Sequence, residues 1–209
     1  MSDEPGQAEF WEQKWEQALS QHGDAVRRMP PNAHLLAEVG DLAPGRALDA
    51  GSGHGAETIW LAGKGWQVQA VDFSVTALEH ARTTAASLGS DIADRIEWVE
   101  GDLSTWMPEQ EAFDLVSCLY VHVAGDVAEM VSRLGQGVAP GGTLLMVGHQ
   151  PIDPATGDRT AAWGQVQLSV ADAREALDEN EWEIVVAEER GRAGGGGVDA
   201  VIRAVRRDS

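Results

Sequence analysis

A short apolar run that leads into a glycine-rich turn constrains the fold more than any other feature of this sequence. The turn is Asp-Ala-Gly-Ser-Gly-His-Gly, residues 49–55, and the strand-like residues 47–50 lead into it. Beyond the turn, apolar runs typical of buried strands alternate with stretches that have helical spacing. Such alternation predicts βαβ units, in which helices cover both faces of a parallel sheet.

The predicted elements follow one another in a regular order. Ser74 is a favourable N-cap for one helix, and Pro140-Gly141-Gly142 is expected to end another. Strands are expected at residues 47–50, 68–72, 96–99, 113–119 and 143–147, and the helices between them at 56–64, 75–88 and 127–138.

The C-terminal part follows a different pattern. A helix is expected at residues 170–179, where Ser169 and Asp172 form a pattern similar to a capping box. Two strand-like runs follow at 182–188 and 200–206, and the glycine-rich loop between them is too short for a crossover helix. These two strands must therefore be antiparallel. The predicted fold class is α/β: a Rossmann-like, doubly wound, mostly parallel seven-stranded sheet with a C-terminal antiparallel hairpin and N-terminal helices.

The N-terminal part contributes the additional helices. Trp11, Trp15 and Leu19 recur at i, i+4 and i+8, which gives a helix one apolar stripe. Asn32 is expected to cap a second helix at residues 33–39. We predict that residues 1–41 form a helical lid or cap on a single globular unit of residues 42–209. The alternative is that the tryptophan stripe packs on the sheet as part of the core, or against a second subunit in a homodimer.

Composition limits the possible partners. A chain of 209 residues is long enough for one domain. Its formal net charge of −19 repels phosphate backbones and anionic lipids, which argues against nucleic acid and membrane partners and favours a small-molecule substrate. The acidity can also serve solubility alone.

Cysteine content and the N-terminus bear on the compartment. Cys118 is the only cysteine, so an internal disulfide and a cysteine-based zinc cage are excluded. No basic start with an apolar core follows Met1, and no apolar run approaches the ~20 residues of a membrane span. We therefore expect a cytoplasmic protein, and we expect no metal site.

The spacing of the glycines argues against a nicotinamide cofactor. Gly51, Gly53 and Gly55 are spaced G-x-G-x-G, whereas the dinucleotide fingerprint is G-x-G-x-x-G. Asp72 ends the second predicted strand, where a carboxylate can accept hydrogen bonds from ribose hydroxyls, and Asp102 follows the third. Three strand ends thus converge on one crevice, the place where open α/β sheets bind ligands.

The ordered set of motifs resembles that of the class I S-adenosylmethionine-dependent methyltransferases. The likeness covers about residues 34–206 and includes LDAGSGHG, AVDFS, EGDLSTW, FDLVSCLYVHV and APGGTLLMV. The resemblance implies S-adenosylmethionine as cofactor and methyl transfer to O, N or S of a small molecule, possibly a heteroaromatic one, by in-line displacement.

The resemblance also implies roles for individual residues. Gly51 and Gly53 would flank the methionyl part of the cofactor, and Asp49 would lie near its amino group. The ribose would be held by Asp72 and the adenine amine by Asp102. The remaining predicted cofactor contacts are Phe73 and Leu103, which would pack on the ring, with Ser52, Cys118 and Trp15. Cys118 also suits a small buried residue at the end of a strand.

The segments FWEQKW and P-N-x-H-L-L are similar to the thiopurine and tellurite-resistance group of methyltransferases. Members of that group place an N-terminal aromatic segment over the cofactor site. The acceptor side is expected after the fourth and fifth strands, where Tyr120, His122 and His149 are the candidate catalytic residues. Either histidine could act as a general base, or be a satisfied loop or core histidine.

Two other classes of function remain open. A protein that binds the cofactor without turnover, as a sensor or an assembly partner, would carry the same cofactor motifs. A nicotinamide dehydrogenase is disfavoured by the glycine spacing and by the terminal hairpin. An amino-methylating enzyme of nucleic acids is disfavoured because S-C-L-Y follows the fourth strand where those enzymes have an N-P-P-Y type motif.

Overall fold

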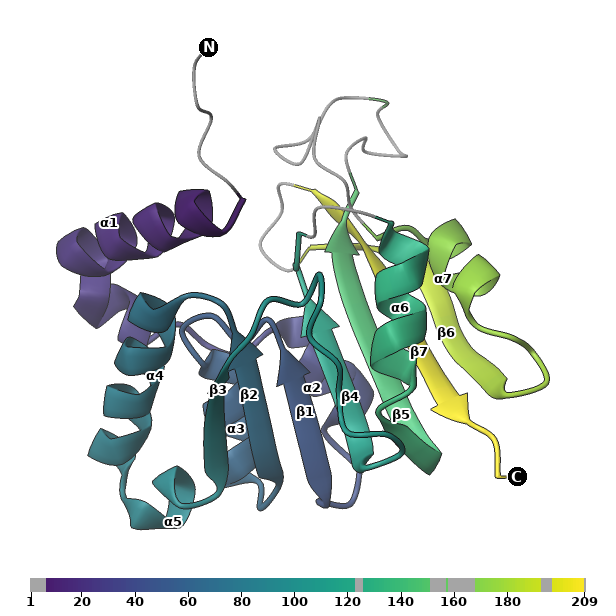
Figure 1. Ribbon diagram of the computed structural model, residues 1–209, viewed down its shortest axis with the longest axis horizontal. Helices are drawn as coiled ribbons and strands as arrows, with labels where there is room; N and C mark the ends of the chain where they lie inside the picture. Colours follow the sequence, from purple (N-terminus) through teal and green to yellow (C-terminus); the bar gives the residue numbers. More distant parts are fainter. Residues whose placement is uncertain (1–6, 123–125, 151–156, 158–167, 193–196, 209) are drawn as a thin grey trace. The chain divides into compact units, whose positions relative to one another are not determined.

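The computed structural model describes residues 7–122, 126–150, 157, 168–192 and 197–208 (Figure 1). The chain divides into two compact units that interleave along the sequence. Unit 1 comprises residues 1–32 and 43–106, and unit 2 comprises residues 33–42 and 107–209. The predicted division into residues 1–41 and 42–209 stays a prediction.

Unit 1 contains three parallel strands and four helices among the described residues. The strands lie in the order β3-β2-β1, with Asp49 of β1 opposite Ala70 and Asp72 of β2 opposite Glu100. The strands are β1 (Arg46–Ala50), β2 (Gln67–Asp72) and β3 (Ile96–Glu100), and the helices are α1 (Gln7–Arg27), α3 (Ala56–Gly63), α4 (Val75–Leu88) and α5 (Ser90–Ala93).

Local sequence rules explain the start of α4. The Ser74 hydroxyl accepts a hydrogen bond from the backbone N–H of Ala77 at 3.1 Å, which satisfies one of the donors that a helix leaves unpaired at its start. Leu48 of β1, Val71 of β2 and Ala81 of α4 are fully buried, so the apolar runs found in the sequence form the core of this unit.

The predicted N-terminal helix is present and is longer than its apolar stripe. In Figure 1, α1 lies beside α4, and its closest packing within unit 1 is against that helix. A kink at His22, where φ is −138°, separates two helical stretches. Trp11 and Trp15 are half-buried, and Val26 is buried.

Unit 2 contains one parallel and two antiparallel strand pairs. Its strands lie in the order β4-β5-β7-β6; β4 and β5 are parallel, and β7 is antiparallel to both β5 and β6. Its elements are α2 (Ala33–Val39), β4 (Phe113–Leu119), α6 (Val127–Gly135), β5 (Val138–His149), α7 (Val170–Ala176), β6 (Trp182–Gly191) and β7 (Val198–Arg206).

The predicted fold class is confirmed. The seven strands belong to a mixed, mostly parallel sheet that ends in the antiparallel β6–β7 hairpin, and the capping box at Ser169 and Asp172 is formed. None of the described helices is both long and apolar enough to cross a bilayer.

The boundary between α6 and β5 differs from the prediction. The helix ends at Gly135, and β5 already begins at Val138 and continues through Pro140-Gly141-Gly142. The pairing of β5 with β4 skips these residues, because the register shifts between Phe113 and Leu115. Proline is tolerated there since an irregular stretch of the ladder does not need its missing N–H. The prediction that these residues end the helix was therefore wrong.

Candidate cofactor and acceptor sites

The glycine turn of unit 1 has a left-handed backbone at each of its three glycines. Gly51, Gly53 and Gly55 have φ values of 83°, 49° and 80°, a region that side chains with a Cβ atom rarely enter. The backbone N–H groups of Gly51 and Ser52 both donate to the carbonyl of Val71, at 2.8 and 3.0 Å. The turn is thereby fixed to the end of β2, next to Asp72.

Asp72 connects the end of β2 with the turn. Its Oδ2 accepts from the Gly53 N–H at 2.8 Å, and its Oδ1 accepts from the Ser74 N–H at 2.9 Å. The two oxygens of an ionised carboxylate offer four acceptor positions. A backbone hydrogen bond from Phe73 takes a third position, so one remains for a ribose hydroxyl. On balance the pKa of Asp72 is raised: burial raises it, the backbone N–H groups of Ser74, Gly53 and Phe73 lower it, and the charge of nearby Glu12 raises it.

Asp49 joins β1 to the helix that follows the turn. Its side chain is buried, and its Oδ2 accepts from the Thr58 hydroxyl of α3 at 2.6 Å. This bond fixes the start of α3 behind the turn. The proximity of Asp49 to the cofactor amino group stays a prediction.

Two buried polar atoms of the turn support a polar ligand there. Among the described residues, the Ser52 hydroxyl and the Nε2 atom of His54 are buried and have no hydrogen-bond partner. Most buried polar groups in folded proteins are paired. A turn with three left-handed glycines, a buried carboxylate and two unpaired polar atoms fits the polar methionyl and ribose portions of S-adenosylmethionine.

Helix α1 covers this turn. A Cβ atom on Gly53 would lie 2.9 Å from Cζ2 of Trp15, and the Trp15 and His54 rings are 5.7 Å apart between centroids. Glu12, one turn earlier on α1, accepts hydrogen bonds from the backbone N–H and the hydroxyl of Thr76. Trp15 was predicted to be near the cofactor and lies on the turn, whereas the role of Glu12 was not predicted.

The other predicted residues of unit 1 lie close to the same strand ends. Asp102 is exposed, and its Oδ1 accepts from the Ser104 N–H at 2.8 Å, which shapes the turn after β3. Leu103 is buried. Phe73 is half-buried and lines an open surface hollow together with Glu9, Glu12, Gln13, Glu16 and Val75. The contacts of Asp102, Leu103 and Phe73 with adenine stay predictions.

The predicted residues of unit 2 lie on β4, on β5 and in the loop after β4. Cys118 is buried in β4 opposite Met146 of β5, as expected for a small core residue, and its contact with the cofactor stays a prediction. Tyr120 and His149 meet at the ends of the two strands, where their rings stack 4.0 Å apart. His122 follows in the loop after β4 and is half-buried.

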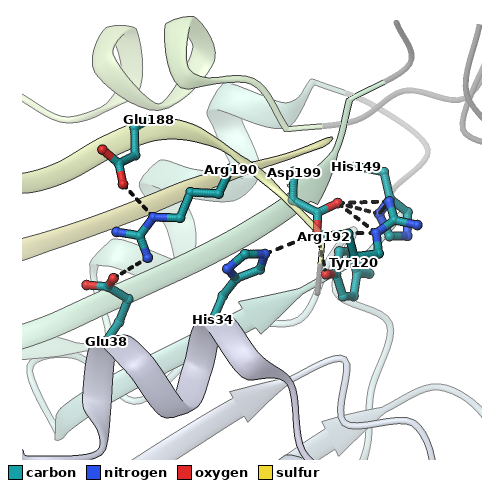
Figure 2. A network of polar contacts seen from close by, with 8 residues as sticks. All are labelled: His34, Glu38, Tyr120, His149, Glu188, Arg190, Arg192 and Asp199. Atoms are coloured by element: carbon teal, nitrogen blue, oxygen red, sulfur yellow. Dashed lines mark hydrogen bonds and ion pairs between the residues drawn. The ribbon is translucent and has the colours of Figure 1, made fainter. Parts of the chain in front are cut away.

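A buried carboxylate on β7 organises the predicted acceptor side (Figure 2). Asp199 is completely buried and lies opposite His149 in the β5–β7 ladder. Its Oδ2 accepts from the Tyr120 hydroxyl at 2.7 Å, and its Oδ1 lies 2.9 Å from Nη2 of Arg192 and 3.0 Å from Nδ1 of His149. His34 of α2 approaches Oδ2 at 3.3 Å.

These donors keep Asp199 ionised. Burial by itself raises the pKa of this carboxyl, but its polar contacts with His149, Arg192 and Tyr120 and the charge of Arg192 lower it far below its usual range. Tyr120 reaches Asp199 from a left-handed backbone with a φ of 55°, which is uncommon outside glycine and marks a position that its surroundings fix. We call Tyr120, His149, Arg192 and Asp199 the Asp199 cluster.

Neither Asp199 nor Arg192 was predicted. Their roles depend on the antiparallel pairing of β5 with β7, which brings residues 50 positions apart into contact. The one available signal was the aspartate within the otherwise apolar run Val-Asp-Ala-Val-Ile, since a charge on a buried strand needs partners. A second ion network lies nearby, where Arg190 of β6 pairs with Glu38 of α2 and with Glu188 (Figure 2).

Several known proteins with similar sequences are methyltransferases. Residues 47–142 match the methyltransferase domain family. A probable thiol methyltransferase 2 of Arabidopsis thaliana is 32% identical over 150 residues, which are 70% of this chain and 64% of that protein. Thiocyanate methyltransferase 1 of the same plant is 35% identical over 106 residues, 51% of this chain and 44% of that protein. The chain therefore spans less than two thirds of the length of these curated relatives.

Solved structures show the same fold. The N-methyltransferase NodS from Bradyrhizobium japonicum, solved with S-adenosyl-L-homocysteine, superimposes with a TM-score of 0.70 at 18% identity, over 94% of this chain and 98% of that one. The class predicted from the motifs is thus confirmed: the fold is that of the class I S-adenosylmethionine-dependent methyltransferases. S-adenosylmethionine is the cofactor of this class, as the motifs predicted. The finer likeness to the thiopurine and tellurite-resistance group stays a prediction.

Proposed function

We propose that the protein transfers the methyl group of S-adenosylmethionine to the sulfur atom of a small molecule in the cytoplasm. The observation that carries the methyl-transfer part is the glycine turn, in which the Gly53 N–H is bonded to Asp72 and the Ser52 hydroxyl has no partner among the described residues. The choice of sulfur over oxygen or nitrogen is supported by the names of the relatives, which act on thiols and on thiocyanate.

Methyl transfer to sulfur depends more on the alignment of the two reactants than on acid or base groups of the protein. The sulfonium of the cofactor is already a good leaving group, so the protein has to align the acceptor sulfur with the methyl carbon and exclude water. Such alignment can lower the barrier by roughly 7–11 kcal/mol. The turn and Asp72 would hold the cofactor, whereas Tyr120, His122 and His149 are the candidates for contact with the acceptor.

Binding of the cofactor is the first test. Calorimetric titration with S-adenosylmethionine, S-adenosylhomocysteine and NAD should show binding of the first two and none of the third. Asp72→Ala should weaken binding by about tenfold or more, because the carboxylate both fixes Gly53 and accepts from the ribose. Binding of NAD alone would refute the proposed cofactor, and unchanged affinity in the variant would remove Asp72 from the site.

Turnover is the second test. The wild-type protein, saturated with S-adenosylmethionine, is offered a thiol, thiocyanate, a phenol and an amine, and S-adenosylhomocysteine is measured as the common product. Turnover of the sulfur acceptors supports the proposal, whereas preference for the phenol or the amine contradicts the choice of sulfur. Cofactor binding without turnover of any acceptor would favour the alternative of a non-catalytic sensor or assembly protein.

A further inference from the structure

The Asp199 carboxylate has no capacity left for a ligand. It is fully buried, and its two oxygens face Tyr120, His149, Arg192 and His34. Two oxygens offer four acceptor positions, and these face the Tyr120 hydroxyl, the Nη2 and Nε atoms of Arg192 and Nε2 of His34 without counting His149. The side chains around the carboxylate are more accessible: 25% of His149 and 32% of Arg192 is exposed. A ligand in this cluster would therefore meet the side chains that Asp199 holds.

The Nδ1 atom of His149 lies between two neighbours that require opposite protonation of the ring. Nη2 of Arg192 is 2.7 Å away, and Oδ1 of Asp199 is 3.0 Å away. A guanidinium has only donors and keeps its proton in proteins, so the contact with Arg192 requires a lone pair on Nδ1. The contact with the carboxylate requires a proton there instead. A neutral imidazole satisfies one of the two neighbours.

Of the two contacts of His149 Nδ1, the one with Arg192 is shorter than the one with Asp199. Hydrogens can also be placed on Arg192 so that both Asp199 and His149 receive one. The two hydrogens of Nη2 can go separately to Asp199 Oδ1, at 2.9 Å, and to His149 Nδ1. Asp199 does not depend on His149, because Tyr120 and the Nε and Nη2 atoms of Arg192 also donate to it. The arginine therefore favours the tautomer of His149 that carries its proton on Nε2.

We propose that Arg192 holds His149 in the Nε2–H tautomer, so that the Asp199 cluster binds the acceptor as an anion and does not deprotonate a neutral acceptor. This inference rests on the proposed methyl transfer. His149 then presents an N–H donor and Arg192 a positive charge, with its Nη1 outside the bonds to Asp199 and His149. Asp199 is a positioning residue, which fixes Tyr120 and Arg192 without touching the acceptor.

The chemistry of sulfur acceptors agrees with such a site. A thiolate or a thiocyanate ion donates a sulfur lone pair to the methyl carbon while the bond from that carbon to the sulfonium sulfur breaks. The products are the methylated acceptor and neutral S-adenosylhomocysteine, and there is no proton to remove. A donor site for the anion is therefore sufficient, and a general base is not needed.

The tautomer is tested directly by nitrogen NMR on the full-length protein with S-adenosylhomocysteine. The two ring nitrogens of His149, assigned by comparison with His149→Gln, should show a protonated Nε2 and an unprotonated Nδ1. In Arg192→Met the proton should move to Nδ1, because Asp199 Oδ1 is the other close neighbour of Nδ1 among the described residues. A protonated Nδ1 in the wild-type protein would overturn the proposal, and this result needs no variant other than His149→Gln for the assignment.

The anion site is tested with thiocyanate as the probe. Charge-assisted hydrogen bonds contribute about 1.5–3 kcal/mol, so Arg192→Met should raise the KM for thiocyanate by about tenfold to hundredfold while the Kd for S-adenosylmethionine stays unchanged. Arg192→Lys should recover part of the loss. Arg190→Met is the matched control, since Arg190 is a similarly exposed arginine whose partners are Glu38 and Glu188. An unchanged KM in Arg192→Met, or an equal rise in the control, would refute the site.

Failure of this inference is distinguishable from failure of the proposed function. If the wild-type protein does not methylate any sulfur acceptor, the proposed function fails. Two results would refute the role of Arg192 while supporting the proposed function. In the first, the wild-type protein methylates thiocyanate but Arg192→Met has the same KM. In the second, it methylates thiocyanate but its His149 Nδ1 carries the proton.

Discussion

Single residues of the glycine turn are constrained both by their own backbone and by the helix that covers them. Gly53 has a positive φ, its N–H donates to Asp72, and its open side faces the ring of Trp15. A side chain at this position thus meets two separate obstacles. Gly55 is similar, because a Cβ there would lie 2.8 Å from Cβ of Ala81.

We expect Gly53→Ala to destabilise the protein and to weaken cofactor binding. The left-handed backbone costs about 1 kcal/mol with a Cβ atom, and the contact with Trp15 adds to that. The double variant Gly53→Ala/Trp15→Leu should be less unstable than the sum of the two single variants, because the steric contact is absent in it. The free energy of unfolding in urea measures the stability of the single variants and of the double variant.

Gly63→Ala is the control for this series. Gly63 ends α3 and has no positive φ, and a Cβ atom added to it would meet no described neighbour within 4 Å beyond its own helix. The change should leave stability equal or slightly higher, since alanine restricts the unfolded chain more than glycine does. Additive effects of Gly53→Ala and Trp15→Leu would mean that Trp15 does not press on the turn.

Asp199 predicts a dependence of stability on pH. Its pKa is lower in the folded protein than in the unfolded chain, so its contribution is present above the unfolded value of about 3.9 and is lost as the pH falls through the folded value. Asp199→Asn should lower the free energy of unfolding by about 3 kcal/mol at neutral pH, because Arg192 loses its buried partner. The difference from wild type should shrink as the pH falls below about 4.

Urea unfolding at a series of pH values measures this difference. Glu183→Gln, an exposed carboxylate change on β6, is the control and should stay close to wild type throughout. A difference between Asp199→Asn and wild type that does not vary with pH would show that the variant acts through packing instead of charge.

Among the secondary-structure elements, α1 provides a side chain that caps the N-terminal end of α4. Ser74 caps α4 from its own chain, and Glu12 of α1 accepts from the N–H of Thr76 at the second position of the same helix. Burial raises the pKa of Glu12, and the hydrogen bonds from Ser74 and Thr76 lower it to a net value below its usual range. The carboxylate is also favourably placed for the dipole of α4.

Glu12→Gln should therefore loosen the packing of α1 on α4. We expect a loss of about 1 kcal/mol in the free energy of unfolding at neutral pH. Amide exchange in α1 should accelerate more than exchange in β2. Glu16→Gln, one turn further along α1 and exposed, is the matched control. Equal exchange rates in the two variants would refute the capping role of Glu12.

Helix and strand limits that are marked by neighbouring residues in the sequence could be predicted. Limits that depend on the pairing of distant strands could not. The predicted residues 75–88 and 113–119 coincide with α4 and β4, because a serine cap and an apolar run mark their limits. The early start of β5 at Val138 depends on its register with β4, which no local rule contains. The same division holds for the sites: Asp72 follows a strand within one βαβ unit, but Asp199, Arg192 and Glu12 act across long sequence distances.

At the scale of the whole molecule, the chain passes repeatedly between its two units. Residues 33–42 belong to unit 2 although they lie between the two segments of unit 1. Unit 2 uses this segment, because His34 bonds to Asp199 and Glu38 pairs with Arg190. The chain segments before and after α2 both belong to unit 1. If unit 1 unfolds, neither end of α2 is attached to a folded segment any more, so we expect the two units to unfold together.

Cofactor binding makes this coupling measurable. A ligand at 100 times its Kd stabilises the protein to which it binds by about 2.7 kcal/mol. If the units unfold together, saturation with S-adenosylmethionine should slow exchange of the slowest amides in β7 as much as in β2. This would hold although all the predicted cofactor residues except Cys118 lie in unit 1. Asp72→Ala should reduce both effects equally at the same cofactor concentration, to about 1.4 kcal/mol if the Kd rises tenfold. Protection confined to β2 and the glycine turn would instead show two independently unfolding units, and the bond between His34 and Asp199 would then hold α2 to unit 2 alone.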